Sequence, residues 1–187
     1  MYTDTIKKDD KTLFFQKNGV ELLKFNIFEK YNDILVHCFT TRIGGVSTGE
    51  CKSLNLGFKR RDSRENVIEN YKRVCSALNI NMKDMVLSDQ IHDKRIKTVN
   101  ESDRGKGLLK ESDIKGFDGL ITDKKNVALV TFYADCVPVF IFDAGKRAIG
   151  LAHSGWRGTM KEIAREIVEK MCEEYESRPC DMKVAVG

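Results

Sequence analysis

The sequence predicts an α+β protein whose mixed β-sheets are packed between helices. Short runs of β-branched and aromatic residues are separated by glycine-containing turns, which is typical of strands. Two longer stretches instead carry apolar residues at the spacing of one helical face. The stretch from 131 to 160 combines both patterns, because two apolar runs are followed there by the start of a helix.

Composition bounds the protein before any motif is considered. The chain has 187 residues, of which 41% are apolar, and this suffices for one domain with a sizeable core. The net charge of +4 is too small to indicate a nucleic-acid partner. We find neither a signal-peptide core nor an apolar run of membrane-spanning length, so we expect a cytoplasmic protein that does not bind membranes. There the six cysteines, which form no CxxC pair, would stay reduced.

The first elements are predicted to be a hairpin and a third strand. Strands over 12–15 and 20–28 flank Asn18-Gly19, and Asn-Gly between apolar runs is a strong hairpin signal. The run ILVHCFTT, residues 34–41, predicts the third strand.

A helix is predicted to follow Asp62. Asp62 and Glu65 resemble a capping box. The apolar face of the helix comprises Val67, Tyr71, Val74, Cys75 and Leu78. We expect the helix to end at Asn79 or Asn81.

The second half of the chain is predicted to hold the remaining sheet and a second helix. Short strands are expected over 85–91, 95–99 and 117–122. An antiparallel hairpin follows, with one strand over 132–142 and a second ending at His153. The helix is predicted over 159–175 and a last strand over 182–186.

Three residues with metal-binding side chains fall at predicted strand ends. They are His92, Cys136 and His153, and the hairpin places the last two side by side. Two imidazoles and a thiolate leave one tetrahedral position open, as catalytic zinc sites do. Cys136 and His153 alone could instead form a nucleophile–base pair. A lone cysteine or histidine is also commonly structural, and we assign His37, Cys38 and the remaining four cysteines to that role.

A second pattern suggests anion binding. Residues 154–159, SGWRGT, lead directly into the predicted helix, and Arg157 adds a charged, forked donor. Arg42 lies in a loop with three glycines, residues 42–49, which also offers the hydroxyl of Ser47. Alternatively, Thr159 only caps the helix and the arginines are solvated.

Several ordered motifs resemble those of one family. They are TTRIGGVS at 40–47, SLNLG at 53–57, QIH at 90–92, FDG at 117–119, ADCVPV at 134–139 and AHSGWRG at 152–158. In this order they resemble the laccase-domain family, also called multicopper polyphenol oxidoreductases and now regarded as purine nucleoside phosphorylases. The resemblance covers residues 12–187.

The resemblance implies a fold, a metal and a reaction. Its three zinc ligands fall on His92, Cys136 and His153, and copper is a possible alternative ion. It implies phosphorolysis of adenosine, inosine, guanosine and methylthioadenosine, together with adenosine deamination. The substrates would be purine nucleosides and phosphate. The implied α+β fold belongs to a group that includes toxin deamidases with a Cys–His pair.

We assign further roles at the matching positions. Arg42, Ser47, Asn55 and Arg157 are the expected substrate- and phosphate-binding residues. Cys136, His153 and Asp135 are the expected catalytic residues. Asp135 and Asp93 are candidates for the general acid, because they neighbour the ligands in sequence.

The sequence departs from the family pattern in two places. Asp93 stands where members usually have glycine after the first histidine, so it could narrow the pocket or add a carboxylate near the metal. Members also continue beyond the strand that ends at Gly187. We therefore expect residues 1–187 to form a single domain that is incomplete at its C-terminal end.

Three other functions compete with a nucleoside phosphorylase. A cysteine hydrolase or amidase would use Cys136 and His153 and need no metal. A copper-binding polyphenol oxidoreductase is suggested by the older family name, but three histidines cannot supply the copper sites of a true laccase. The chain could also bind nucleosides without converting them. The preferred purine and the oligomeric state are not determined by the sequence.

Overall fold

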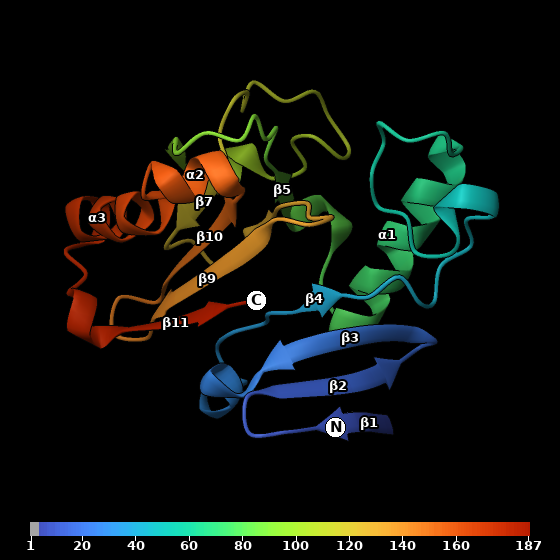
Figure 1. Ribbon diagram of the computed structural model, residues 1–187, viewed down its shortest axis with the longest axis horizontal. Helices are drawn as coiled ribbons and strands as arrows, with labels where there is room; N and C mark the ends of the chain where they lie inside the picture. Colours follow the sequence, from blue (N-terminus) through green and yellow to red (C-terminus); the bar gives the residue numbers. More distant parts are fainter. Residues whose placement is uncertain (1–3) are drawn as a thin grey trace. The chain divides into compact units, whose positions relative to one another are not determined.

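The computed structural model describes residues 4–187, which form two compact units. The first unit ends at Met82 and the second runs from Lys83 to Gly187. Helices and several sheets occur together, and one sheet mixes parallel and antiparallel pairs, which confirms the α+β class (Figure 1). The expectation of a single domain over 1–187 stays a prediction.

The first unit is a four-stranded antiparallel sheet with one long helix. Its strands are β1 (Asp4–Lys8), β2 (Thr12–Lys17), β3 (Val20–Phe25) and β4 (Phe39–Thr40), in that order. The β2–β3 turn has φ of 53° at Asn18 and 78° at Gly19. Positive φ at both residues is the requirement of a type I′ turn, so the Asn-Gly hairpin is confirmed.

Helix α1 (Arg64–Leu78) packs its apolar face into the core of this unit. A side-chain hydrogen bond caps its N-terminus, and a left-handed residue ends it at the C-terminus. Val74 and Ala77 pack with Leu13 and Leu22 of the sheet. The N-cap is Ser63, whose hydroxyl accepts from the Asn66 amide, rather than the predicted Asp62. Asn79 ends the helix in a left-handed conformation, as expected. Short 3₁₀ helices lie at Asn26–Tyr31 and Gly49–Cys51.

The predicted strand over 34–41 is realised only at its last residues. Residues 34–37 keep the in–out alternation of a strand, since Leu35 and His37 are buried while Ile34 and Val36 are exposed. Their backbone has no ladder partner among the described residues. The segment is held instead through the His37 side chain, whose Nε2 accepts a hydrogen bond from the Phe25 amide at 2.9 Å.

The second unit is built on a five-stranded sheet in the order β11-β9-β10-β7-β6. These strands are β6 (Ile96–Thr98), β7 (Gly119–Thr122), β9 (Val137–Asp143), β10 (Ala148–Ser154) and β11 (Met182–Val186). Only the β6–β7 pair in this sheet is parallel. A separate parallel pair joins β5 (Met85–Leu87) to β8 (Ala128–Val130). Short 3₁₀ helices lie at Met82–Asp84, Glu101–Asp103 and Pro179–Asp181.

The single helix predicted over 159–175 is two helices. Helix α2 (Trp156–Met160) starts earlier, and α3 (Ile163–Tyr175) follows after Glu162, whose φ of 60° interrupts the helical backbone. Ile163, Ile167 and Met171 of α3 are fully buried in the core that α3 forms with the sheet. In Figure 1 this red-orange helix lies against β10 and β7.

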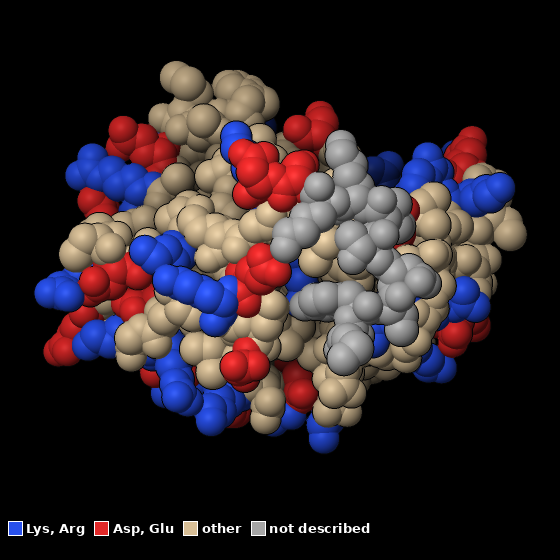
Figure 2. Space-filling view, turned by 90° about the horizontal axis from the view of Figure 1, so that it is seen from below, with Lys and Arg blue, Asp and Glu red and all other residues tan. Residues whose placement is uncertain are grey.

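The surface carries both signs of charge, as the 32 basic and 28 acidic residues of the sequence lead one to expect. On the face shown in Figure 2, basic and acidic side chains are interspersed. Among the described residues, we find no helix with the length and apolar character needed to cross a bilayer.

Candidate metal centre

The second unit brings His92, Cys136 and His153 together. One ligand atom from each side chain lies within 4.8 Å of the others. The two imidazole rings have centroids 4.9 Å apart and are nearly perpendicular, at 84°. His92 is exposed, Cys136 is half-buried and His153 is buried, so the group opens to solvent on one side. This is the three-residue group that the sequence predicts.

The β9–β10 hairpin positions two of these residues. In its register His153 is opposite Pro138, and Ser154 is opposite Val137. Cys136 directly precedes β9 and therefore lies beside the end of β10. The apolar run 132–142 predicted that Cys136 lies inside a strand, but β9 begins only at Val137. His153 lies in the central strand of the five-stranded sheet; it is opposite Pro138 of β9, and on the other side its amide donates to the Asp118 carbonyl at 2.7 Å.

His92 comes from a loop, and its backbone is unusual. Its φ of 63° lies in the left-handed region that residues other than glycine rarely adopt. The Asp118 carboxylate holds this loop, accepting from the backbone amides of Ile91 at 3.0 Å, His92 at 2.9 Å and Asp93 at 2.9 Å.

Asp118 also contacts the second histidine. Its Oδ1 lies 2.8 Å from Nδ1 of His153, and it is fully buried. Burial disfavours the charged carboxylate, but the hydrogen bonds from His153 and the loop amides outweigh it and lower the pKa of Asp118. Asp118 belongs to the FDG motif at 117–119, and no role was predicted for it from the sequence. A carboxylate at the start of a buried strand was the available signal.

Gln90 joins the histidine loop to the segment that carries Cys136. Its amide nitrogen donates to the Phe132 carbonyl at 2.8 Å, and its amide oxygen accepts from the Phe132 amide at 2.7 Å. Next to it, the Tyr133 hydroxyl donates to the Ala152 carbonyl at 3.0 Å. The Tyr133 ring lies 5.6 Å from that of His153. Side chains therefore hold Phe132 and Tyr133 in place, in the segment 131–136 that lies outside the strands.

Gly155 lies against all three candidate ligands. A Cβ at this position would be 2.9 Å from Cδ2 of His92, 3.1 Å from Sγ of Cys136 and 3.6 Å from Cε1 of His153. Its φ of −72° is open to any residue, so the need for glycine is one of space. The missing side chain leaves room beside the nitrogen and sulfur donors.

The thiol of Cys136 is not activated by its protein surroundings alone. Burial raises its pKa, and the neighbouring Asp135 and Asp118 carboxylates raise it further. Its Sγ lies 3.7 Å from Oδ1 of Asp135, which is exposed. A nucleophilic cysteine requires the opposite shift, whereas a coordinated cation would stabilise the thiolate.

Asp93 points toward Lys161. Its carboxylate forms an ion pair with the Lys161 ammonium at 2.6 Å. Hydrogen bonding to Lys161 is the main cause of the lowered pKa of Asp93. The residue that replaces the usual glycine thus links the histidine loop to the end of α2.

Arg157 is exposed on α2. Its guanidinium lies 5.1 Å from the Trp156 ring centroid in a cation–π contact, and Trp156 itself is 70% exposed. The Thr159 hydroxyl donates to the Gly155 carbonyl at 3.0 Å and lies 2.8 Å from that of Ser154.

The other predicted phosphate-binding residues belong to the first unit. Arg42 donates from its guanidinium to the Lys52 carbonyl. The hydroxyl of Ser47 donates to Asp62 at 2.6 Å, and the amide of Asn55 donates to the same carboxylate at 2.9 Å. These bonds hold the loop that carries Arg42. Their role in phosphate binding stays a prediction.

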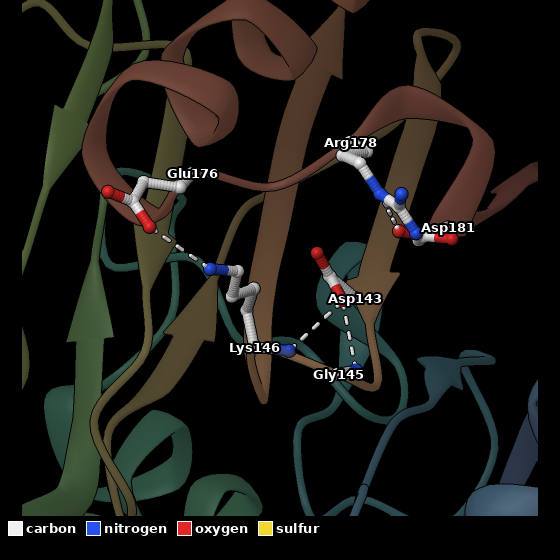
Figure 3. A pocket seen from close by; sticks show the side chains of 6 residues that line it. All are labelled: Asp143, Gly145, Lys146, Glu176, Arg178 and Asp181. Atoms are coloured by element: carbon white, nitrogen blue, oxygen red, sulfur yellow. Dashed lines mark hydrogen bonds and ion pairs between the residues drawn. The ribbon is translucent and has the colours of Figure 1, made fainter.

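A pocket of about 400 Å³ lies at the opposite end of β9 (Figure 3). Lys146 and Glu176 form an ion pair across it at 3.3 Å, and Arg178 and Asp181 form another at 2.6 Å. Asp143 is buried there and accepts from the amides of the hairpin turn. These carboxylates do not form a metal-binding group like that around His153.

Solved structures of other proteins have the same fold as this chain. A Bacillus licheniformis hypothetical protein, YfiH, superposes with a TM-score of 0.77 at 32% identity, covering 100% of this chain and 65% of its own. The crystal structure of YlmD from Geobacillus stearothermophilus gives 0.77 at 31% identity, over 98% of this chain and 64% of its own.

Curated relatives are similar in sequence over most of this chain. Purine nucleoside phosphorylase YlmD of Bacillus subtilis is 39% identical over 83% of this chain, and purine nucleoside phosphorylase LACC1 of Homo sapiens is 36% identical over 83%. The chain spans 56% of the length of the first and 34% of the second. The profile described as multi-copper polyphenol oxidoreductase laccase matches residues 36–187. By sequence and by fold, the chain belongs to this laccase-domain family.

Proposed function

We propose that this chain carries the metal centre of a zinc-dependent purine nucleoside phosphorylase. The reaction would convert adenosine, inosine, guanosine or methylthioadenosine and phosphate to free base and a ribose 1-phosphate, with deamination of adenosine as a second activity. The observation that carries the proposal is the His92, Cys136 and His153 group, whose ligand atoms lie within 4.8 Å. Relatives named purine nucleoside phosphorylases support the substrate class.

The residues present fit a zinc ion. Two imidazoles and one thiolate are common zinc ligands, and three protein ligands leave one position for a substrate or solvent molecule. Gly155 provides the space beside the donors. When bound, zinc supplies Lewis-acid activation of water or substrate. Copper could compete for the same donors, because its affinity for such ligands is high.

The protein side chains would bind and orient the second substrate. Cleavage of an N-glycosidic bond develops positive charge on the ribose, and a phosphate anion held beside it stabilises that charge. Arg157, exposed on α2, offers forked donors to phosphate oxygens. The motif that contains Arg42 supports a phosphate-binding role for this residue as well. Asp135, next to Cys136, is the candidate general acid for the leaving base.

The metal assignment predicts one zinc per chain and its loss from Cys136→Ser. Serine cannot supply a thiolate, so the zinc content of the purified variant should fall sharply. Elemental analysis measures it, and Cys180→Ser is the matched control because Cys180 is an exposed cysteine outside the group. If Cys136→Ser keeps full zinc and loses activity, Cys136 is a nucleophile and the metal model is wrong.

The reaction predicts products that depend on phosphate. Adenosine should yield adenine and ribose 1-phosphate only when phosphate is present, whereas inosine from deamination should form with or without it. Chromatography of the products at varied phosphate measures both. Arg157→Lys should weaken phosphate use more than nucleoside binding, because lysine lacks the guanidinium fork. Equal adenine release without phosphate would identify a hydrolase, and an unchanged phosphate dependence would exclude Arg157.

A cysteine hydrolase is the second candidate, and one observation favours it. Cys136, His153 and Asp118 have the composition of a nucleophile, a base and an orienting carboxylate. The proposed relation to toxin deamidases belongs with this alternative. The raised pKa of the Cys136 thiol argues against it in the metal-free protein. Formation of neither adenine nor inosine in the product assay would favour the hydrolase.

A further inference from the structure

We infer that Asp118 is the positioning residue of the metal centre. Its carboxylate fixes both the ring of His153 and the backbone of His92, so that two of the three ligands are preorganised by one buried side chain. The inference rests on the proposed metal function and extends it to a residue that contacts no metal itself.

The contact with His153 determines which ring nitrogen remains for a metal. Oδ1 of Asp118 lies 2.8 Å from Nδ1 of His153. An ionised carboxylate can only accept, so Nδ1 carries the proton and Nε2 keeps its lone pair for a metal. The backbone adds a second tie, since the His153 amide donates to the Asp118 carbonyl at 2.7 Å. The imidazole is thus held at the ring and at the main chain.

The contact with the His92 loop is made through three successive amides. Oδ1 accepts from His92 at 2.9 Å, while Oδ2 accepts from Ile91 at 3.0 Å and Asp93 at 2.9 Å. Successive amides that converge on one anion form a nest. This nest stabilises the left-handed backbone of His92 and thereby the direction of its ring.

Asp118→Asn should weaken both the contact with the His153 ring and the contact with the His92 loop, with little change in side-chain volume. An amide group offers one acceptor oxygen, and its NH2 group would face an N–H donor instead of accepting from it. Both ligands would lose part of their orientation. Loss of a residue that orients metal ligands typically lowers metal affinity by about 10–100-fold.

Competition with a chromogenic zinc chelator measures this effect on the full chain. Asp118→Asn should bind zinc about 10–100-fold more weakly than the wild type. Asp143→Asn is the matched control, because Asp143 is also a buried aspartate of the second unit that accepts from backbone amides, at 2.9 and 3.1 Å, outside the ligand group (Figure 3). It should bind zinc like the wild type. Equal zinc affinity in folded Asp118→Asn would overturn the inference.

A second measurement needs no variant and no metal. Long-range proton–nitrogen NMR of the metal-free wild type reports the tautomer of each of the three histidines. We expect His153 as the Nδ1–H tautomer. The Nε2–H tautomer there would overturn the role of Asp118, even if Asp118→Asn fails to fold.

The two measurements also separate this inference from the proposed function. Absence of zinc binding by the wild type would refute the metal centre, and with it the positioning of metal ligands by Asp118. Tight zinc binding by the wild type and by Asp118→Asn alike would leave the metal centre intact and refute only the role of Asp118. Weak binding confined to Asp118→Asn, with the Nδ1–H tautomer in the wild type, supports both.

Discussion

At the scale of single residues, the absence of a side chain is as important as the ligands themselves. Gly155 leaves a space in which any Cβ would lie within 2.9 Å of His92 and 3.1 Å of Cys136. Contacts this close require a neighbour to move, and the neighbours here are two of the candidate ligands. The size of the centre is therefore set by a glycine that carries no chemistry.

Gly155→Ala is expected to weaken zinc binding by about 10-fold or more, because the new methyl group displaces ligands from their common position. The negative φ of residue 155 is compatible with alanine, so the melting temperature of the variant should change little. The chelator competition assay and a melting curve measure the two effects. Gly145→Ala is the control, since its Cβ would meet only Asp143 Oδ1, at 3.4 Å. Undiminished zinc affinity in Gly155→Ala would show that the ligands adapt.

At the scale of elements, the segment after the first 3₁₀ helix is held by a buried histidine. His37 is 8% exposed and accepts a hydrogen bond from the Phe25 amide. Burial, and then the positive charge of Lys24, lower its pKa from 6.5 to about 4. The folded protein thus keeps His37 neutral where the unfolded chain is already protonated.

This shift predicts a loss of stability in weak acid. Between pH 6.5 and about 4 the unfolded state binds one proton more at His37, so the free energy of unfolding falls as the pH falls through this window. The full effect is at most about 3 kcal/mol. Urea unfolding at pH 7 and pH 4.5 measures it. His37→Gln keeps an acceptor but cannot titrate, so its pH slope should be smaller. Equal slopes in both proteins would contradict the prediction.

The sequence predicted which elements exist better than where they end. The Asn18-Gly19 hairpin was predictable because its turn chemistry is local. The strand predicted over 34–41 was largely wrong. Leu35 and His37 keep the alternating burial of a strand, but their backbone has no ladder partners among the described residues. The break at Glu162 was also missed, since nothing in its residue type announces a left-handed backbone.

At the scale of the whole molecule, the candidate site joins residues that are far apart in sequence. The hairpin register placed Cys136 beside His153 without any knowledge of the fold. His92 was proposed as a third ligand from its predicted strand end and was favoured by the family resemblance, but its loop is positioned by long-range bonds that involve Asp118 and Gln90 rather than by a local pattern. The hydrogen-bond partners of Asp118 and Gln90 could not be predicted from sequence spacing alone. The three-residue group was thus predictable, and the side chains that hold it in place were not.

The three candidate ligands lie in different kinds of backbone, and this predicts an order in which a bound zinc ion would be released. His153 belongs to the central strand β10, whereas His92 and Cys136 lie outside the strands. Loops open locally far more often than paired central strands. Release would therefore begin at His92 or Cys136 while His153 keeps its hold. Rebinding of the ion would follow the reverse order. His153 would bind it first, and His92 and Cys136 would bind it afterwards.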